Sequence, residues 1–556
     1  MDNIGAVNHG EIVTPPQAST RQDQVLHVEG HEVGEQPSSG SGCPEQPFEA
    51  VKETPLPKLQ LFILLYLQLA EPITSTVIYP FVNQLVRQTG VTGGDERKTG
   101  YFAGLVESCF YAVEAICVLQ WGRASDRIGR KPVLLGGLLG LTLSMIGFGL
   151  SRQYWAVILS RCAEGALNGN IGVTKSMMAE ITDHTNRARG FAFMPMIWSL
   201  GSTLGPMIGG IFATPAERWP GFRDSTFWTT YPYFLPCIIV ACISISAFLF
   251  ALVGMKETLH RAPDGKLESN RLPLPAADTE RATRDLERTQ QSHMHIAEEA
   301  RTTTPEAASP TTESKEETKT DAVADVQVSD TDTDDDKPIT LRTILVPCVL
   351  YPILNYGFLA LTDQSVIVLV PLMYSTSIDL GGLGFSSFTI GVIQGVGGCV
   401  GGAIQIFTFP YMLRRFGAKR LYGCSFAMYF VVYALFPLLS FVVKREGKVG
   451  RTAWALVVLQ WVAYVGTFMT WGCVFIYISD AAPNQKALGI TNGLAQTTAS
   501  TVRAIAPSFA SSLFSATLER HLAAGTLVYW IMCGISIAGV IASRWLPASL
   551  QRQGAS

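Results

Sequence analysis

Residues 122–131 have the sequence Gly122-Arg-Ala-Ser-Asp-Arg-Ile-Gly-Arg-Lys131, which is strongly charged and lies between apolar runs at roughly 101–121 and 132–150. A run of about 20 apolar residues is long enough to cross a bilayer as a helix. The helices on either side must reverse direction within a few residues, and Gly129 supplies the backbone freedom for that turn. The segment therefore predicts a cytosolic loop between two membrane-spanning helices.

The composition of the whole chain is typical of a polytopic membrane protein. Of its 556 residues, 48% are hydrophobic and 16% are charged, whereas soluble domains carry about 25% charged residues. The net charge of -3 offers no basic surface for nucleic acid, which we exclude as a partner. No Gly-x-x-x-x-Gly-Lys-Ser/Thr phosphate loop occurs, so we expect energy from a gradient and no cofactor.

Twelve apolar segments are long enough to span a membrane, six on each side of a long polar stretch. We predict an all-α integral membrane protein with twelve transmembrane helices in two six-helix, pseudo-symmetric halves. The predicted spans are roughly 59–83, 101–121, 132–150, 154–180, 189–213, 228–254, 343–374, 386–410, 421–442, 453–479, 487–515 and 524–546.

Polar segments set the predicted domain boundaries. The stretch between the halves is rich in Pro, Thr, Ser, Asp and Glu and cannot bury a core. We predict a disordered cytosolic tail over 1–57, an N-terminal bundle over 58–258, a disordered acidic cytosolic linker over 259–337, a C-terminal bundle over 338–546 and a tail over 547–556.

Loop charges predict the orientation. Cytosolic loops of membrane proteins are enriched in Lys and Arg, and the loops 122–131, 184–189 and 414–420 are basic. An even number of spans places both termini on the same side, which we therefore predict to be the cytosol. The loop 443–451, predicted on the opposite side, is also basic and opposes this prediction.

The two halves show traces of a repeat. The segment Ser125-Asp-Arg-Ile-Gly-Arg-Lys-Pro132 aligns with Leu413-Arg-Arg-Phe-Gly-Ala-Lys-Arg420, so that Arg, Gly and Lys recur in register. Transporters are often built from such internal repeats. The second copy has Arg414 where the first has Asp126.

The charged residues of the first loop suit a contact between helix ends. Asp126 is able to accept hydrogen bonds from the N-terminal amides of another helix, and the basic residues are able to pair with acids nearby. The natural acidic partners are Glu180 and Asp183, at the end of the fourth span. A simpler alternative is that the cations only set the topology.

The loop resembles the signature Gly-x-x-x-Asp-Arg-x-Gly-Arg-Lys of the major facilitator superfamily. This resemblance implies the major facilitator fold and a cytoplasmic latch that stabilises the outward-facing state. The residues that it assigns to the latch are Gly122, Asp126, Arg127, Gly129, Arg130 and Lys131. Because Arg414 replaces the acid, we do not expect an equivalent latch in the second half.

The fifth span contains a ladder of small residues that permits close helix packing, and a proline that removes one backbone hydrogen bond. Close helix packing alone is sufficient to explain these residues. The ladder also resembles the Gly-x-x-x-Gly-Pro-x-x-Gly-Gly motif of proton-coupled exporters in the superfamily. Its residues are Gly201, Gly205, Pro206, Gly209 and Gly210.

Other segments narrow the resemblance to one branch. Ala70-Glu-Pro72, Ile78-Tyr-Pro-Phe81 and Trp121-Gly122 resemble fungal and plant zinc-induced facilitator-like proteins. All eight histidines lie outside the predicted spans, so we expect no metal site within the membrane.

Ionisable residues within the spans are the candidate functional residues. Arg161, Glu164, Asn168 and Lys175 share one face of a continuous helix over 154–180. A charge in hydrocarbon costs several kcal/mol by most estimates, so such residues face a cavity or one another. Arg161 and Glu164 are alternatively a pair that only neutralises itself.

Burial penalises the charged form of a carboxyl group and makes it a candidate for proton exchange near neutral pH. We choose Glu71 first as the proton site, whereas Glu107 is alternatively a solvated residue at the rim. The predicted proton-coupling and substrate cavity contains Glu71, Glu107, Glu114, Arg161, Glu164, Asn168, Asp363 and Arg503.

Together these features predict a secondary active transporter and not an enzyme. We predict a proton-coupled antiporter that exports a small organic compound, a drug or specialised metabolite, by alternating access. Its partners are the lipid bilayer, the substrate and protons, and we expect a monomer in the plasma membrane rather than the vacuolar membrane. The alternatives are a facilitator or importer of a small polar solute such as a sugar, and a nonconducting sensor.

Overall fold

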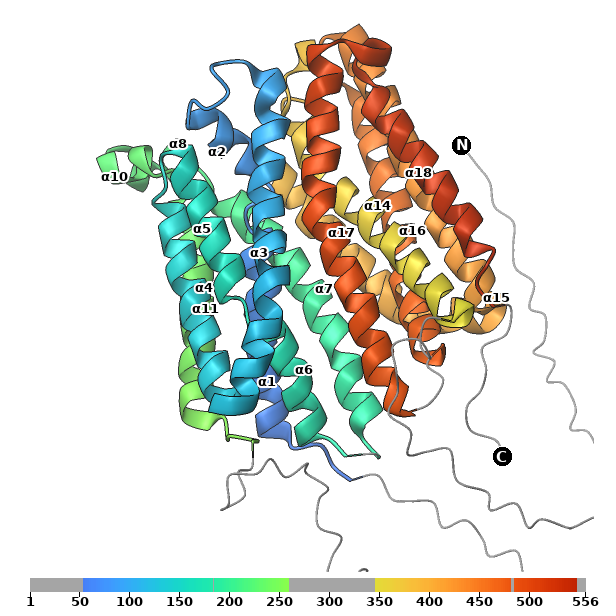
Figure 1. Cartoon of the computed structure of the whole chain (residues 1–556). Coiled ribbons are helices and arrows are strands. Elements are labelled where there is room, and N and C mark those ends of the chain that lie inside the picture. The colour runs from blue at the N-terminus through green and yellow to red at the C-terminus, as the bar shows by residue number, and fades with distance from the viewer. Residues whose placement is uncertain (1–53, 184, 260–345, 482–484, 548–556) are drawn as a thin grey trace, which may run out of the picture. The chain divides into compact units, whose positions relative to one another are not determined.

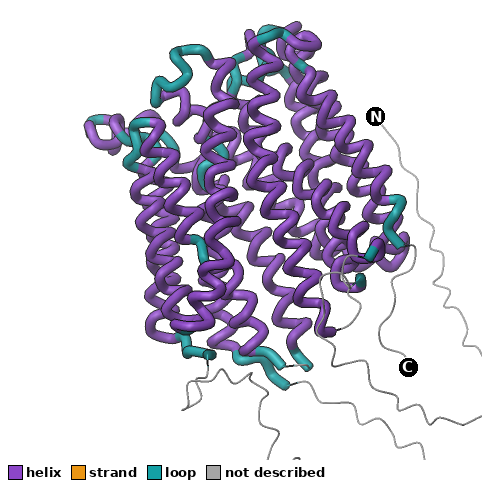
Figure 2. Tube along the Cα trace, viewed as in Figure 1, coloured by secondary structure: helices purple, strands orange, loops and turns teal. Residues whose placement is uncertain are grey.

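The computed structural model describes residues 54–183, 185–259, 346–481 and 485–547. The predicted tail over 1–57, the linker over 259–337 and the tail over 547–556 lie mostly outside these residues. All regular secondary structure in the described part is helical, as Figure 2 shows. The prediction of an all-α protein is therefore confirmed.

The first half consists of long helices joined by short connections, some of which contain a helical turn. The long helices are α1 (Lys58–Thr76), α3 (Thr99–Ile128), α4 (Arg130–Gly149), α5 (Tyr154–Leu167), α6 (Asn170–Ile181), α7 (Arg187–Phe212) and α11 (Phe234–Gly254). The short elements are α2 (Val82–Gln88), η1 (Glu96–Lys98), α8 (Pro215–Arg218), α9 (Pro220–Arg223) and α10 (Thr226–Thr230).

The second half repeats this arrangement with fewer connecting elements. Its elements are α14 (Pro347–Ser375), η3 (Ile378–Leu380), α15 (Ser387–Glu446), α16 (Arg451–Asp480), α17 (Gln485–Glu519), η4 (Leu522–Gly525) and α18 (Leu527–Ser543). Helix α15 is 60 residues long but contains non-helical backbone at Gly417, where φ is 75°. It therefore corresponds to two predicted spans that meet at the second basic loop.

By length and composition, seven of the described helices are able to cross a membrane. Counting α15 as two spans and α5 with α6 as one interrupted span, the described helices are consistent with the twelve that we predicted.

One prediction about the fourth span is wrong, because the helix over 154–180 is interrupted. Helix α5 ends at Leu167 and α6 begins at Asn170. Gly169 packs directly on the ring of Trp121, since a Cβ at Gly169 would lie 2.4 Å from Trp121 Cγ. Trp121 Nε1 also donates a hydrogen bond to Ala166 O at 2.6 Å, which satisfies a carbonyl near the end of α5. Arg161, Glu164, Asn168 and Lys175 therefore do not lie on one continuous helix.

The two halves meet along two helix pairs, α3 with α17 and α7 with α15. Small residues make both approaches possible. A Cβ at Gly104 would lie 1.7 Å from Ser511 Oγ, and a Cβ at Gly210 would lie 2.5 Å from Gly391 Cα. In Figure 1, α3 and α17 run beside each other between the two halves.

The bundle has two distinct ends, which we name by their residues. The Gly129 end contains the turn between α3 and α4, the start of α1 and the end of α11. The α2 end contains α2, α8 and α10 and lies at the top of Figure 1. At the α2 end, Arg87 Nη2 donates to Ser375 O at 2.9 Å, and Ser377 N donates to Glu96 Oε1 at 3.0 Å. Because Arg87 also pairs with Glu96, one ion pair holds the turn after α14.

Candidate functional site

Arg130 is the centre of the charged contacts at the Gly129 end. Its Nη1 donates to Ser125 Oγ at 2.6 Å and to Asp126 Oδ1 at 2.5 Å, and its Nε donates to Glu180 Oε1 at 3.0 Å. Arg130 is buried, whereas Asp126 is exposed. A single guanidinium thus joins the end of α3 to the end of α6. We name Asp126, Arg130, Glu180 and Glu257 the α4-start network.

Glu257, which follows α11, belongs to this network although our sequence analysis did not select it. Its two carboxylate oxygens accept hydrogen bonds from Arg130 N at 2.9 Å and Lys131 N at 3.0 Å. These are the first amides of α4, and such amides have no partner within their own helix. The negative carboxylate also suits the positive end of the helix dipole. Burial alone would raise the pKa of Glu257, but hydrogen bonds from the amides of Leu259, Arg130, Lys131 and Thr258 lower it below its ordinary value.

Gly129 is required by the geometry of this turn. Its φ of 123° is a conformation that side chains other than glycine rarely adopt. A Cβ at Gly129 would also lie 2.6 Å from Glu257 Oε2. The glycine that sequence analysis explained by backbone freedom is therefore also needed for contact with the acid of another segment.

The remaining predicted latch residues are distributed around the turn. Lys131 Nζ donates to Leu252 O at 2.9 Å, near the end of α11, and Arg127 is exposed. A Cβ at Gly122 would meet nothing within 4 Å, so close packing does not explain that glycine. We predicted Asp183 as a partner of the basic residues. The structure instead places it in the α6–α7 loop, where it accepts hydrogen bonds from Thr185 N and Asn186 N.

The glycine ladder of α7 packs on two helices. One face touches α1, where a Cβ at Gly205 would lie 2.1 Å from Thr76 Oγ1. The other face touches α15, where a Cβ at Gly391 would lie 2.6 Å from Pro206 O and 2.9 Å from Gly210 N. This ladder therefore brings the first half close to the second. The glycines that face α1 are Gly201, Gly205 and Gly209.

A buried charged group lies inside the first half, which we name the Arg161 cluster: Glu107, Arg161 and Glu164. Arg161 Nη1 lies 2.6 Å from Glu164 Oε2, and both side chains are 0–1% exposed. The Arg161 guanidinium also lies 4.5 Å from the ring centroid of Phe110. Glu107 is 1% exposed, so the alternative of a solvated rim residue is wrong.

The Arg161 cluster does not use all of its hydrogen-bonding capacity. Arg161 Nε and Nη2, Glu164 Oε1 and Glu107 Oε2 are buried and have no hydrogen-bond partner within the described part of the chain. Buried polar groups normally have partners, and each exception calls for an explanation. Simple mutual neutralisation of Arg161 and Glu164 leaves these four atoms unexplained.

A second group, the Glu71 cluster, comprises Glu71, Glu114, Asn168, Lys175 and Arg503. Asn168 Nδ2 donates to Glu114 Oε1 at 2.8 Å, directly at the break between α5 and α6. Glu71 is 2% exposed, and its Oε2 is without a hydrogen-bond partner in the described residues. Lys175 and Arg503 lie close enough to Glu71 to interact with it electrostatically. Lys175 itself is exposed.

Asp363 is the charged residue of α14, and two tyrosines orient it. Tyr429 OH donates to Asp363 Oδ1 at 2.9 Å and Tyr464 OH at 3.2 Å. Arg503 interacts electrostatically with both Asp363 and Glu114, and its guanidinium lies 5.5 Å from the Trp471 ring. Arg503 therefore connects the acids of the two halves.

Several of these partners were not predicted. Tyr429, Tyr464 and Tyr79 lie in apolar spans, where most aromatic residues only pack. Tyr79 OH lies 3.4 Å from Tyr111 OH and accepts a long hydrogen bond from Gln364 Nε2 at 3.5 Å. Spacing along one helix gives no signal for such contacts between helices.

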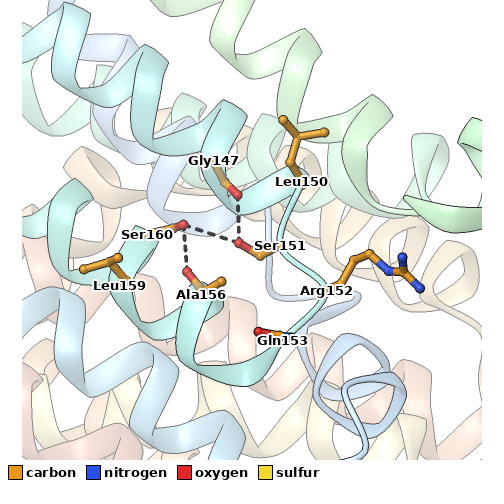
Figure 3. A pocket seen from close by; sticks show the side chains of 8 residues that line it. All are labelled: Gly147, Leu150, Ser151, Arg152, Gln153, Ala156, Leu159 and Ser160. Carbon is orange, nitrogen blue, oxygen red and sulfur yellow. Dashed lines mark hydrogen bonds between the residues drawn. The ribbon is translucent and has the colours of Figure 1, made fainter.

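The pocket in Figure 3 lies apart from both charged clusters. It is formed at the turn between α4 and α5, and Ser151 and Ser160 satisfy their hydroxyls on the carbonyls of Gly147 and Ala156 at 2.7 and 2.8 Å. None of the predicted site residues lines it. The described residues also contain no group of three or more His, Cys, Asp or Glu side chains able to hold a metal ion.

Comparison with known proteins agrees with the geometry. A model of the Major Facilitator Superfamily matches residues 64–507. The Major facilitator superfamily multidrug transporter mfsB of Aspergillus fumigatus is 31% identical over 526 residues, covering 89% of this chain and 85% of that protein. Protein ZINC INDUCED FACILITATOR-LIKE 1 of Arabidopsis thaliana is 25% identical over 513 residues, covering 90% and 94%. The resemblance to both groups that we predicted is confirmed.

A solved structure shows the same fold. The crystal structure of a D-xylose-proton symporter matches with a TM-score of 0.59 and 14% identity, over 88% of this chain and 98% of that chain. The family match covers well over half of the chain and includes α3, α7, α15 and the greater part of α17, the helices at which the halves meet. This chain is a multi-pass membrane transporter that belongs to the major facilitator superfamily.

Proposed function

We propose that this transporter is a proton-coupled antiporter that exports a small organic compound, a drug or specialised metabolite, by alternating access. The observation that carries the proposal is the set of buried acids with unused hydrogen-bonding capacity, Glu71 and Glu107. Taking a carboxylate out of water costs free energy unless it is paired, and binding a proton relieves that cost. Both residues are therefore suited to bind and release protons.

Glu71 is the better candidate for the coupling step. It interacts electrostatically with the exposed Lys175 and with Arg503, whereas Glu107 lies with the fully buried Arg161. A proton at Glu71 removes one of the negative charges that these cations face. In the proposed mechanism, a proton from outside neutralises Glu71 and the altered charge balance releases the substrate. The substrate site then lies between Glu71 and Asp363, with Arg503 in contact with both halves.

The orientation and membrane also belong to this proposal. We place the Gly129 end in the cytosol because the first basic loop lies there. Both termini are then cytosolic, in the plasma membrane, and the protein acts as a monomer. The name of the fungal multidrug transporter and the α7 ladder support export. The α4-start network ties α3, α4, α6 and the segment after α11 together at this end, and we propose it as the part of the latch that the first half contributes.

The experiment that tests the proposed antiport begins by identifying the substrate. Metabolites inside and outside cells that lack or overexpress the protein are compared without preselection, and the compound that accumulates outside is then loaded into reconstituted vesicles. Efflux is measured with and without an imposed pH gradient. We expect Glu71→Gln to lose the response to the gradient but to retain exchange of labelled for unlabelled compound.

The matched control is Glu217→Gln, which changes an exposed acid on α8 and leaves coupling intact. Full gradient-driven efflux by Glu71→Gln would reject Glu71 as the proton site. Transport by the wild type that ignores the gradient would reject antiport and favour a facilitator.

A further inference from the structure

The segment before α1 is attached to the α6–α7 loop through one residue, Thr54. Its backbone amide donates to Thr185 Oγ1 at 3.1 Å, and its carbonyl accepts from Asn186 Nδ2 at 3.2 Å. Its hydroxyl donates to Asp183 Oδ2. The hydroxyl also lies 3.0 Å from Thr185 Oγ1 and accepts from Asn186 Nδ2 at 3.1 Å, so five contacts hold this segment on a loop that is distant in sequence.

Asp183 is charged where it meets Thr54. Hydrogen bonds from the hydroxyls of Thr185 and Thr54, with further ones from the amides of Thr185 and Asn186, lower the pKa of Asp183 to about 2. Asp183 is thus a carboxylate at any physiological pH. The attachment depends on Thr54 presenting a hydrogen-bond donor to this anion.

Thr54 is also chemically accessible. It is exposed, and residues 54–57 are non-helical. Pro55 follows it directly, and proline favours an extended conformation in the residue before it. An exposed, extended Thr-Pro dipeptide is the substrate form that proline-directed protein kinases accept.

We propose that Thr54 is a phosphorylation site whose modification detaches the segment before α1 from the α6–α7 loop. Thr54 Oγ1 attacks the γ-phosphorus of ATP held by a proline-directed kinase, ADP leaves with the electrons of the broken bond, and the hydroxyl proton passes to the kinase base. The product carries a charge of about −2 and accepts hydrogen bonds instead of donating one. It therefore repels Asp183 where the hydroxyl had bound it.

Detachment acts on the Gly129 end of the bundle. The α6–α7 loop connects α6, which carries Glu180, to α7, which carries the glycine ladder. Glu180 binds Arg130, so the loop is continuous with the α4-start network. This inference rests on the proposed cytosolic position of the Gly129 end, because protein kinases use cytosolic ATP.

The first experiment uses the purified full-length protein and does not depend on orientation. It is treated with a proline-directed kinase and ATP, phosphorylated peptides are identified by mass spectrometry, and amide exchange is followed. We expect phosphate on Thr54 and exchange at least about tenfold faster at the Thr54 amide, because detachment breaks the hydrogen bond from this amide to Thr185 Oγ1. The Thr14-Pro15 and Thr304-Pro305 peptides serve as positive controls for kinase activity.

Three variants distinguish the effect of the phosphate from the effect of losing the hydrogen bonds of Thr54. Thr54→Val removes the hydroxyl, so its exchange is fast and unaffected by the kinase. Thr54→Ser retains both the attachment and the response. Asp183→Asn removes the repelling charge, so the same phosphate accelerates exchange less. Absence of phosphate on Thr54 while the control peptides are modified, or unchanged exchange after modification, overturns the inference.

A second measurement in cells tests the orientation separately. An epitope tag added at the N-terminus reports on which side of the membrane the segment before α1 lies. Antibody binding to the tag only after the cells are permeabilised, together with phosphate on Thr54, supports both proposals. Antibody binding to intact cells would reject the orientation within the proposed function, whereas failure of the purified protein to respond rejects the Thr54 site itself.

Discussion

The loop between α3 and α4 and the loop within α15 are two versions of one turn. Gly129 and Gly417 both adopt positive φ, of 123° and 75°. Lys131 Nζ donates to Leu252 O at 2.9 Å near the end of α11, and Lys419 Nζ donates to Arg544 O at 2.8 Å beyond α18. Each loop thus ties itself to the last helix of its own half, which supports the internal repeat.

The difference lies in the ionic contacts. The first loop has Arg130 bonded to Asp126 and Glu180, and the second has Ala418 and Arg414 at the positions of Arg130 and Asp126. A Cβ at Gly417 would meet nothing within 4 Å, whereas one at Gly129 would meet Glu257. We infer that glycine and lysine build the turn, and that the α4-start network adds a function that belongs to the first half alone.

Removal of Arg130 gives the largest expected effect. Arg130→Ala leaves Asp126 and Glu180 without their partner, which we expect to cost about 3 kcal/mol of stability. We also expect transport to fall at least about tenfold, because the end of α3 is released from α6. Thermal unfolding and vesicle transport measure the two effects. Arg414→Ala in the second loop is the matched control, and an equal loss there would contradict the comparison.

Replacement of Gly129 or Gly417 by alanine gives the second-largest expected effect. Each change forces a side chain into a conformation that costs about 2 kcal/mol. We expect Gly129→Ala to be worse than Gly417→Ala, because its Cβ also meets Glu257. Unfolding of the two variants in parallel measures this difference. Addition of Glu257→Ala to Gly129→Ala should reduce the gap, and no reduction would show that the contact is not the cause.

Loss of the Glu257 carboxylate, which accepts hydrogen bonds from the first amides of α4, has a smaller and pH-dependent effect on stability. Glu257→Gln keeps the shape but loses the charge at the start of α4, and we expect it to cost about 1 kcal/mol. The pKa of Glu257 is below its ordinary value of 4.5 in the folded protein. The stabilisation is therefore present above pH 4.5 and is lost as the pH falls through the lowered pKa. The melting temperatures of variant and wild type should converge in acid, and a gap that persists there would reject this role.

A graft of the missing charges gives the smallest effect. Arg414→Asp combined with Ala418→Arg recreates the Asp126 and Arg130 pair in the second loop. We expect a gain of no more than about 0.5 kcal/mol, because Ala418 is buried in the core of the second half and the larger arginine must displace its neighbours. The melting temperature checks this, and Arg414→Asp alone is the control. A gain as large as the loss in Arg130→Ala would show that the pair acts without Glu180 and Glu257.

Much of the fold and part of the site follow from local pattern. Apolar run length predicts the spans because a bilayer has a fixed thickness. The expected contact between the basic loop and Glu180 is present, because residues at neighbouring helix ends are close in any short turn. Asp126 differs from expectation, because it pairs with the Arg130 side chain while the amides of α4 bind Glu257. Glu257 escaped prediction, since it lies 127 residues from Arg130 and nothing in its own segment marks it.

The limits of periodicity are clear in the fourth span. A helical repeat assumes continuous hydrogen bonding, and the break at Asn168 and Gly169 arises because Gly169 packs on Trp121 of another helix. Similarly, Asp363 was selected as an acid within a span, but its tyrosine partners come from α15 and α16. Contacts between helices depend on how the helices are placed, which no single segment encodes.

The amino-acid sequence determines that the chain enters a membrane as helices, because apolar length and the positions of charges are local properties. It also determines where the two turns form, since glycine alone adopts their backbone conformation at low cost. Packing of the helices decides which acids become buried and which find partners. Glu71 and Glu107 are buried because neighbouring helices cover them, and our proposal for proton coupling depends on that burial.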